Sequence, residues 1–205
     1  MSNPGIILVG AGGHAKACID VIEQEGRYQI AGLIGMPDEL DTLRLGYSVL
    51  ATDADLHVLA KQYQHAFISV GQIQSPDARI RIYLRLLELG FQLPTIISPA
   101  AYVSRHATIG MGSIVMHGAV VNAGAEVGNN CIINTRALVE HDAIVKSNCH
   151  ISTGAILNGN ARVGEGSYVG SGCVIREGIT LGEGCMVGMG LSVRQNQASG
   201  TRFVG

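Results

Sequence analysis

Aliphatic residues recur at every sixth position through the second half of this 205-residue chain. Starting at Ile97, each step of six reaches an isoleucine, valine or leucine without a break as far as Val193. A second slot, four residues after each of these, holds only alanine, serine or cysteine from Ala101 to Cys173. A period of six fits neither a helix nor simple strand alternation. It predicts one short strand and one turn per repeat, in which the branched residue fills the interior and the small residue lets the chain bend.

The repeat resembles the hexapeptide-repeat left-handed parallel β-helix, in which three repeats form one triangular coil of about 18 residues. Glycine follows the aliphatic residue in several repeats and supplies turn geometry. Residues one coil apart in the sequence are therefore expected to stack. On this basis Gly159 should lie one coil beyond His141, and Met189 one coil beyond Ser171 at another corner.

The first half of the chain follows a different pattern, in which short apolar runs alternate with segments of helical spacing. We expect strands over 5–10, 28–35, 65–71 and 91–98, and helices over 14–26, 54–63 and 75–90. Such alternation is typical of a small parallel sheet with helices on its faces. The predicted architecture is an α/β Rossmann-like domain over residues 1–92, followed by a left-handed parallel β-helix over residues 93–205.

Composition and charge argue against several classes of protein. The net charge of −2 gives no electrostatic footprint for nucleic acid. No apolar run approaches the roughly 20 residues that cross a bilayer, and the N-terminus lacks the basic region of a secretion signal. We therefore expect no membrane span and a cytoplasmic location. The five cysteines form no CxxC pair, so we expect buried small side chains and no metal site.

The stretch "GAGGHA", from Gly10 to Ala15, has a G-x-G-x-x-A arrangement between a predicted strand and a predicted helix. That context suits phosphates at a helix N-terminus. A NAD-binding sheet would carry an acidic residue about 20 positions further on, where Gly35 and Met36 stand instead. We expect a different nucleotide diphosphate; the alternative is a glycine turn that only packs tightly. His14 would either contact a phosphate or sugar or lie in solvent.

The stretch "LVEHDAIV" places three ionisable residues between two positions of the six-residue period. His141 could accept a proton from an attacking amine or hydroxyl, because imidazole titrates near neutrality. Glu140 and Asp142 are both candidates to fix its tautomer. Gly159, one coil on, could offer a backbone N–H to a reacting carbonyl. The alternative is a polar surface turn without catalytic function.

The order of these motifs resembles the NeuD/PglD-like acyltransferases. "GAGGHAK" is followed by "VGQ" and then by repeats that contain "INTRALVEHDAIV" and "NCHISTGAILNGNARVG". The family includes bacterial nucleotide-aminosugar N-acetyltransferases and sialic acid O-acetyltransferases, and the resemblance covers nearly the whole chain. It implies a homotrimer with active sites between neighbouring β-helices, and acetyl-CoA lying along the helix.

The resemblance also implies roles for individual residues. His141 corresponds to the general base, Asp142 to its acidic partner and Asn134 to a polar residue near the base. His150 and Gly159 correspond to contacts with acetyl-CoA near the thioester.

Two further groups of binding residues follow from the same resemblance. Ser171 and Met189 correspond to contacts with CoA. The nucleotide-sugar pocket is matched by residues of the glycine loop and of the third strand's end: Gly12, Gly13, His14 and Gly71.

The chain departs from the family pattern in two places. The second strand of relatives often ends in acidic residues that bind the nucleotide, whereas here Asp38 and Glu39 lie further along, which leaves the nucleotide base open. Relatives also continue past "FVG" with a short proline-containing tail, so we expect a similar extension here.

The sequence therefore predicts an enzyme that transfers acetyl from acetyl-CoA to the amino group of a nucleotide-linked sugar, expected to be a UDP-4-amino sugar for bacterial surface glycans. Two alternatives stay open: O-acetylation of a sialic acid or related sugar, and a trimeric nucleotide-sugar-binding scaffold without activity. A nucleotidyltransferase is disfavoured, because the first half is short and lacks a basic glycine-rich signature.

Overall fold

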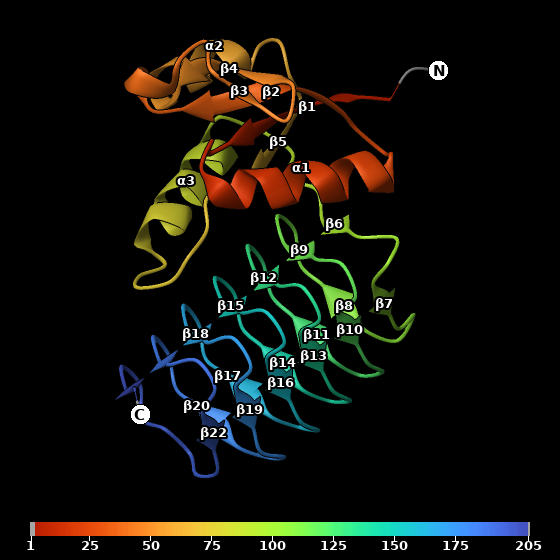
Figure 1. Ribbon diagram of the computed structural model, residues 1–205, viewed down its shortest axis with the longest axis vertical. Helices are drawn as coiled ribbons and strands as arrows, with labels where there is room; N and C mark the ends of the chain where they lie inside the picture. The colour runs from red at the N-terminus through yellow and green to blue at the C-terminus, as the bar shows by residue number, and fades with distance from the viewer. Residues whose placement is uncertain (1–2, 205) are drawn as a thin grey trace. The chain divides into compact units, whose positions relative to one another are not determined.

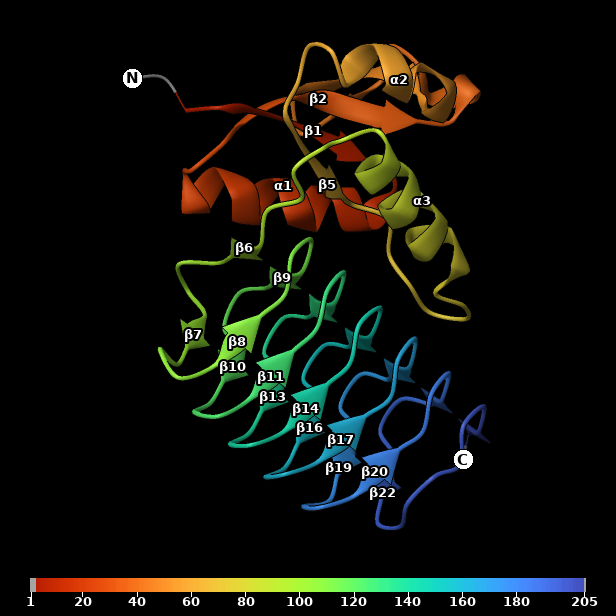
Figure 2. The ribbon, with the colours of Figure 1, turned by 180° about the vertical axis from the view of Figure 1, so that it is seen from behind.

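The computed structural model describes residues 3–204 and divides into two compact units. The first unit comprises residues 3–71 and 77–96, and the second comprises 72–76 and 97–204. The division thus falls after Ile96, and the segment 72–76 belongs to the second unit rather than to the first. Figure 1 labels most elements of both units, and Figure 2 gives the view from behind.

The first unit is built on a five-stranded sheet with the order β3-β4-β2-β1-β5. All its pairs are parallel except β3–β4. Its strands are β1 (Gly5–Val9), β2 (Gln29–Gly35), β3 (Leu43–Arg44), β4 (Tyr47–Thr52) and β5 (His65–Ile68). Its helices are α1 (Gly13–Glu25), α2 (Leu56–Leu59) and α3 (Asp77–Glu88), with 3-10 turns η1 (Pro37–Glu39) and η2 (Asp53–Asp55).

Both faces of this sheet are covered, as the continuous apolar run of β1 predicts. Ile7 and Val9 share a core cluster with residues of α2 and α3, including Leu56 and Leu86. The alternate residues of β1 are also fully buried, because α1 covers the opposite face. Helix α1 ends where Gly26 adopts φ +68°, a left-handed conformation that glycine accepts without steric cost. No helix among residues 3–204 is both long and apolar enough to cross a bilayer.

The first half differs from the expected elements in three places. The β3–β4 hairpin was not predicted at all. The helix expected over 54–63 is reduced to the single turn of α2, because Lys61 and Gln62 donate to carbonyls three residues back and tighten the chain. The strand expected over 91–98 contributes only a bridge between Gln92 and His65, followed by the short β6.

The second unit is a left-handed parallel β-helix whose coils follow one another in chain order from green to blue in Figure 1. Three sheets form its faces. The first has seven strands: β6 (Ile96–Ile97), β9 (Ile114–Val115), β12 (Ile132–Ile133), β15 (His150–Ile151), β18 (Tyr168–Val169), β21 (Met186–Val187) and β23 (Arg202–Phe203). The second has six: β7 (Tyr102–Val103), β10 (Val120–Val121), β13 (Leu138–Val139), β16 (Ile156–Leu157), β19 (Val174–Ile175) and β22 (Ser192–Val193). The third has five: β8 (Thr108–Ile109), β11 (Glu126–Val127), β14 (Ile144–Val145), β17 (Arg162–Val163) and β20 (Thr180–Leu181).

The strand register confirms the stacking expected from the repeat. Val121 pairs with Val139, and Val139 with Leu157, so that each coil lies in register over the next. The inward-facing aliphatic residues form one continuous core together with the buried Cys131 and Cys149. All five cysteines are buried thiols outside any disulfide, and burial raises the pKa of the Cys149 thiol well above its usual value. The cysteines therefore act as small core residues, as predicted.

A positive φ recurs at every sixth residue from Gly112 to Gly190, once in each turn. Glycine fills most of these positions, but Asn130, Asp142 and Asn148 occupy others with φ between 54° and 62°. Asparagine and aspartate tolerate this left-handed region better than other residues with a side chain. Asp142 therefore sits at the turn position itself, where its conformation is fixed by the fold.

Substitution of Leu157 by alanine is expected to lower the free energy of unfolding by about 2–5 kcal/mol, because the fully buried side chain leaves a cavity in a narrow core. Denaturant unfolding of the two forms measures the difference. Ile144→Ala, on the half-buried outer face of β14, is the matched control and should cost much less. Equal losses for both variants would contradict the assigned orientation.

Candidate active site

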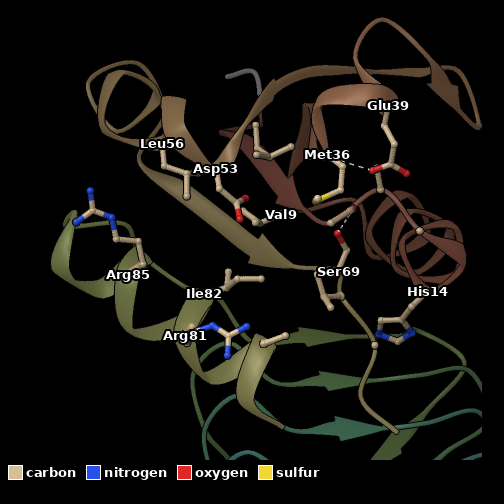
Figure 3. Close-up of a pocket in the computed structure, with 18 of the residues that line it drawn as sticks. Val9, His14, Met36, Glu39, Asp53, Leu56, Ser69, Arg81, Ile82 and Arg85 are labelled. Atoms are coloured by element: carbon tan, nitrogen blue, oxygen red, sulfur yellow. Dashed lines mark hydrogen bonds between the residues drawn. The ribbon is translucent and has the colours of Figure 1, made fainter. Parts of the chain in front are cut away.

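The carboxyl ends of β1, β2 and β5 open onto a cavity of about 920 Å³ in the first unit. This is the edge of a parallel sheet where ligands usually bind. The four residues predicted to bind the nucleotide sugar all line this cavity: Gly12, Gly13, His14 and Gly71. Figure 3 shows its lining, with His14 at the start of α1 and Ser69 after β5.

The glycines of the loop have separate structural roles. Gly10 has φ +118°, and a Cβ there would lie 2.6 Å from the Val70 side chain, so a larger residue would not fit. A Cβ at Gly12 or Gly13 would meet nothing within 4 Å, so the backbone is open at these positions. Helix α1 begins at Gly13 and has no acidic residue in its first turn. Its N-terminal N–H groups can therefore bind an anion that lies in the cavity.

The charged side chains on two sides of the cavity were not predicted from the sequence. Arg81 and Arg85 line it from α3, and Asp53 lines it opposite them (Figure 3). The two arginines are four positions apart on one helix face, a spacing that could have revealed them. Glu39 also lines the cavity, but its carboxylate already accepts hydrogen bonds from the Met36 backbone N–H (2.9 Å) and from Arg44 (3.1 Å).

In the second unit, His141 lies on the turn that follows β13, and a neighbouring carboxylate contacts one nitrogen of its imidazole. Its Nδ1 lies 2.9 Å from Oδ2 of Asp142. Glu140 instead accepts a hydrogen bond from the His141 backbone N–H at 3.1 Å. Asp142 is therefore the residue that orients the ring. In the neutral ring, an Nδ1–H that donates to the carboxylate leaves Nε2 without a proton, so that Nε2 can accept one.

The electrostatics of this pair favour the protonated imidazole. The hydrogen bond that Nδ1–H donates to Asp142 raises the pKa of His141 above its usual 6.5, and the nearby charges of Asp142 and Glu140 add to the effect. The ring is 65% exposed, so that a substrate can reach it. The rigid coil thus presents an oriented base at the surface without burying it.

Gly159 lies directly against this histidine on the next coil, as the stacking predicted. A Cβ at Gly159 would fall 2.6 Å from Nε2 and 2.7 Å from Cε1 of His141. The space beside the reactive nitrogen therefore exists only because the residue is glycine. Within residues 3–204, the Gly159 N–H donates to no other backbone group.

Asn134 and His150 form a second polar pair, away from His141 within one chain. Asn134 lies on the turn between β12 and β13, whereas His141 lies on the turn between β13 and β14. The His150 Nδ1–H donates to the backbone carbonyl of Gln72, so Nε2 accepts from Asn134 Nδ2 at 3.0 Å. His150 is buried and has Tyr168 edge-on at 5.3 Å.

Ser171 and Met189, the other two residues predicted to contact CoA, lie on the same corner of the β-helix. The Gly190 N–H donates to the Ser171 carbonyl, which links the turns that carry Ser171 and Met189. The Ser171 hydroxyl is 2.9 Å from that of Ser152, and Met189 is 80% exposed. No cluster of three or more histidine, cysteine or acidic residues suited to a metal occurs among the described residues.

Comparisons with known proteins agree with this arrangement. Residues 5–86 match the family model described as PglD N-terminal domain, and residues 160–195 match the hexapeptide repeat of succinyl-transferase. A mutant of perosamine N-acetyltransferase from Caulobacter crescentus, solved with CoA and GDP-perosamine, has a TM-score of 0.92 at 30% identity and covers 98% of this chain and 93% of its own. The acetyltransferase domain of PglB from Neisseria gonorrhoeae, solved with acetyl coenzyme A, has a TM-score of 0.88 at 34% identity, over 97% and 94%. A comparison with curated protein sequences gave no match.

An α/β unit with a glycine loop, joined to a left-handed β-helix that carries an oriented histidine, defines a hexapeptide-repeat acyltransferase. Sequence identity of 30–34% over almost the full length of these relatives identifies one family within this class. The chain belongs to the NeuD/PglD-like family of hexapeptide-repeat sugar acetyltransferases.

Proposed function

We propose that this protein transfers the acetyl group of acetyl-CoA to the amino group of a nucleotide-linked sugar. The observation that carries the proposal is the juxtaposition of His141 and Gly159. An imidazole whose neutral form leaves Nε2 unprotonated stands beside a backbone N–H that no side chain shields. The relatives solved with CoA, acetyl coenzyme A and GDP-perosamine support both substrates.

In the proposed mechanism the sugar amine attacks the thioester carbonyl directly. Nε2 of His141 accepts the amine proton, and Asp142 stabilises the imidazolium that forms. The Gly159 N–H donates to the oxyanion of the tetrahedral intermediate, which then collapses and releases the CoA thiolate. No metal takes part in this proposal, since the thioester is already activated and the chain's own groups supply base and donor.

The site is proposed to be completed by a second copy within a homotrimer. The outer face of the six-stranded sheet is mainly apolar, with Tyr102, Val120, Leu138, Ile156 and Val174 along it and Ser192 at its end. The outer face of the five-stranded sheet is mainly polar, with Thr108, Glu126, Arg162 and Thr180. The apolar face supports a trimer in which neighbouring copies pack through this sheet. Such packing would bring Asn134 and His150 of a neighbouring copy toward His141.

The nucleotide is proposed to bind in the cavity of the first unit, with its diphosphate at the start of α1. A UDP-4-amino sugar is the substrate expected from the sequence, and the Caulobacter relative makes a GDP-linked sugar the main competitor. Both fit a role in cytoplasmic synthesis of surface glycans.

Thiol release from acetyl-CoA, measured against UDP-, GDP-, dTDP- and CMP-linked sugars, tests the proposal. Acetylation of an amino sugar, with none of the matching hydroxy sugar, supports N-transfer. Activity confined to a sialic acid would favour the O-acetyltransferase alternative. Binding of nucleotide sugars without thiol release by any of them would favour the scaffold.

The rate is expected to rise with pH as His141 loses its proton. Because the pKa of His141 is raised, the acidic limb of the kcat/KM profile should have its midpoint above 6.5. Asp142→Asn removes the main cause of the raised pKa and should move that midpoint down, while the maximal rate falls. His106→Asn, at an exposed turn of the same β-helix, should leave the midpoint unchanged. An unshifted midpoint in Asp142→Asn would contradict the assignment of the base.

A further inference from the structure

A buried glutamine, Gln72, lies in the short segment 72–76, which belongs to the second unit. The residue is only 3% exposed, although Gln74 in the same segment is exposed. The Nε2 of Gln72 donates to the backbone carbonyl of Asn148 at 3.0 Å. Asn148 lies on the turn between β14 and β15. The side chain of Gln72 therefore anchors the start of the segment to this turn of the β-helix.

The anchored residue presents its own backbone carbonyl to His150. Nδ1 of the His150 ring lies 2.5 Å from this oxygen. A carbonyl oxygen can only accept, so Nδ1 carries a proton, and in the neutral ring Nε2 is then an acceptor. The tautomer of His150 is therefore set by a backbone group, and the side chain of Gln72 holds that group in place.

The amide of Asn134 is oriented by the groups on its two sides. The Thr135 backbone N–H donates to Oδ1 of Asn134 at 2.7 Å. Nδ2 lies on the other side, 3.0 Å from Nε2 of His150. The Gln72 carbonyl at one end of this hydrogen-bond chain can only accept, and the Thr135 N–H at the other end can only donate. The chain of hydrogen bonds therefore has one direction, which neither end can reverse.

This direction decides what Asn134 offers to a bound molecule. Its Nδ2 carries two hydrogens, of which one donates to His150. Within residues 3–204, no group accepts the second hydrogen. Asn134 is only half-buried, so a ligand can reach it. The amide thus presents a donor, which suits an oxygen atom of the reactants, whereas His141 accepts a proton.

We propose that Gln72 is a positioning residue for acetyl transfer. Through His150 it fixes the Asn134 amide so that an N–H, and not the amide oxygen, faces the reactants. This role differs from the direct contact with acetyl-CoA that the resemblance implies for His150. The inference rests on the proposed acetyl transfer and on the packing that brings Asn134 of a neighbouring copy toward His141.

The first measurement is the tautomer of His150, read from the NMR shifts of its ring nitrogens in the full-length protein with labelled histidine. The signal that disappears in His150→Asn identifies the ring. We expect the proton on Nδ1 in the unsubstituted protein. We expect a mixture of tautomers in Gln72→Met, because this side chain keeps its length but cannot donate to the Asn148 carbonyl. Gln74→Met is the matched control and should leave the shifts unchanged.

The second measurement is a double-mutant cycle on kcat, with acetyl-CoA and the best sugar of the panel. His150→Asn can still donate to the Gln72 carbonyl, but its side chain no longer reaches Asn134. It should lower kcat by about tenfold or more, because a misplacement of roughly 1 Å near the reacting atoms has such an effect. Gln72→Met should also lower kcat. Neither substitution should lower kcat further in an Asn134→Ala background, since the group that they position is then absent.

Three results would overturn the inference. The first is a proton on Nε2 of His150 in the unsubstituted protein, and the second is a tautomer that Gln72→Met leaves unchanged. The third is a loss from His150→Asn that persists in the Asn134→Ala background, which would indicate direct contact with acetyl-CoA or a purely structural role. Failure of the proposed function looks different, because the unsubstituted protein would then release no thiol with any sugar, while the tautomer would still report on the hydrogen-bond chain.

Discussion

Replacement of His141 by alanine is expected to lower kcat by about 10²- to 10⁴-fold, the usual contribution of a positioned general base. The ring is exposed on a turn, and its partner Asp142 is held by the left-handed turn conformation rather than by the histidine. Folding and assembly should therefore survive the substitution. Steady-state kinetics with acetyl-CoA and the best sugar from the panel measure the loss.

His106→Ala is the control, since His106 is another exposed histidine on a turn of the same β-helix. It should retain activity. The KM values of His141→Ala should change little, because the imidazole accepts a proton during reaction and is not needed to hold either substrate. Full activity of His141→Ala, with an unchanged melting temperature, would exclude His141 as the base.

The β-helix could be predicted almost completely from the sequence, because the same position of every repeat faces the interior and must be aliphatic. Val139 and Leu157 face a narrow interior that only aliphatic side chains fill, so the period survives in the sequence. Stacking then follows from the period alone, and the period is enough to predict that Gly159 lies beside His141. The choice between Glu140 and Asp142 needed the structure, since only the left-handed turn at Asp142 directs its carboxylate to Nδ1.

The first unit was harder to predict, because its elements depend on contacts between distant segments. The β3–β4 hairpin is short and lies at the edge of the sheet, where Leu43 and Leu50 are exposed and no alternation of polar and apolar residues marks it. Asp53 and Arg81 meet around one cavity although neither belongs to a sequence motif. The pairing of His150 with Asn134 also depends on the fold, because the Gln72 carbonyl that fixes its tautomer is far away in sequence.

Substitution of Gly159 by alanine is expected to lower kcat by about 10²-fold, the cost of misplacing a reacting group by roughly 1 Å. The added Cβ would lie 2.6 Å from Nε2 of His141, so the imidazole must move away from the position where it accepts the proton. The methyl group would also narrow access to the Gly159 N–H that is proposed to stabilise the oxyanion. Since the ring is exposed, it can move without unfolding the coil, and the loss should appear in kcat rather than in stability.

Gly188→Ala is the matched control, because a Cβ at Gly188 meets Leu191 and residues 203 and 204 only at ordinary contact distances of 3.4–3.5 Å. It changes the same residue type on the same kind of coil, so any general cost of a methyl group is common to both variants. If Gly159→Ala kept full activity while its structure showed His141 displaced, proton transfer would not depend on this histidine. If both variants lost activity equally, the effect would come from the β-helix as a whole and not from the space beside Nε2.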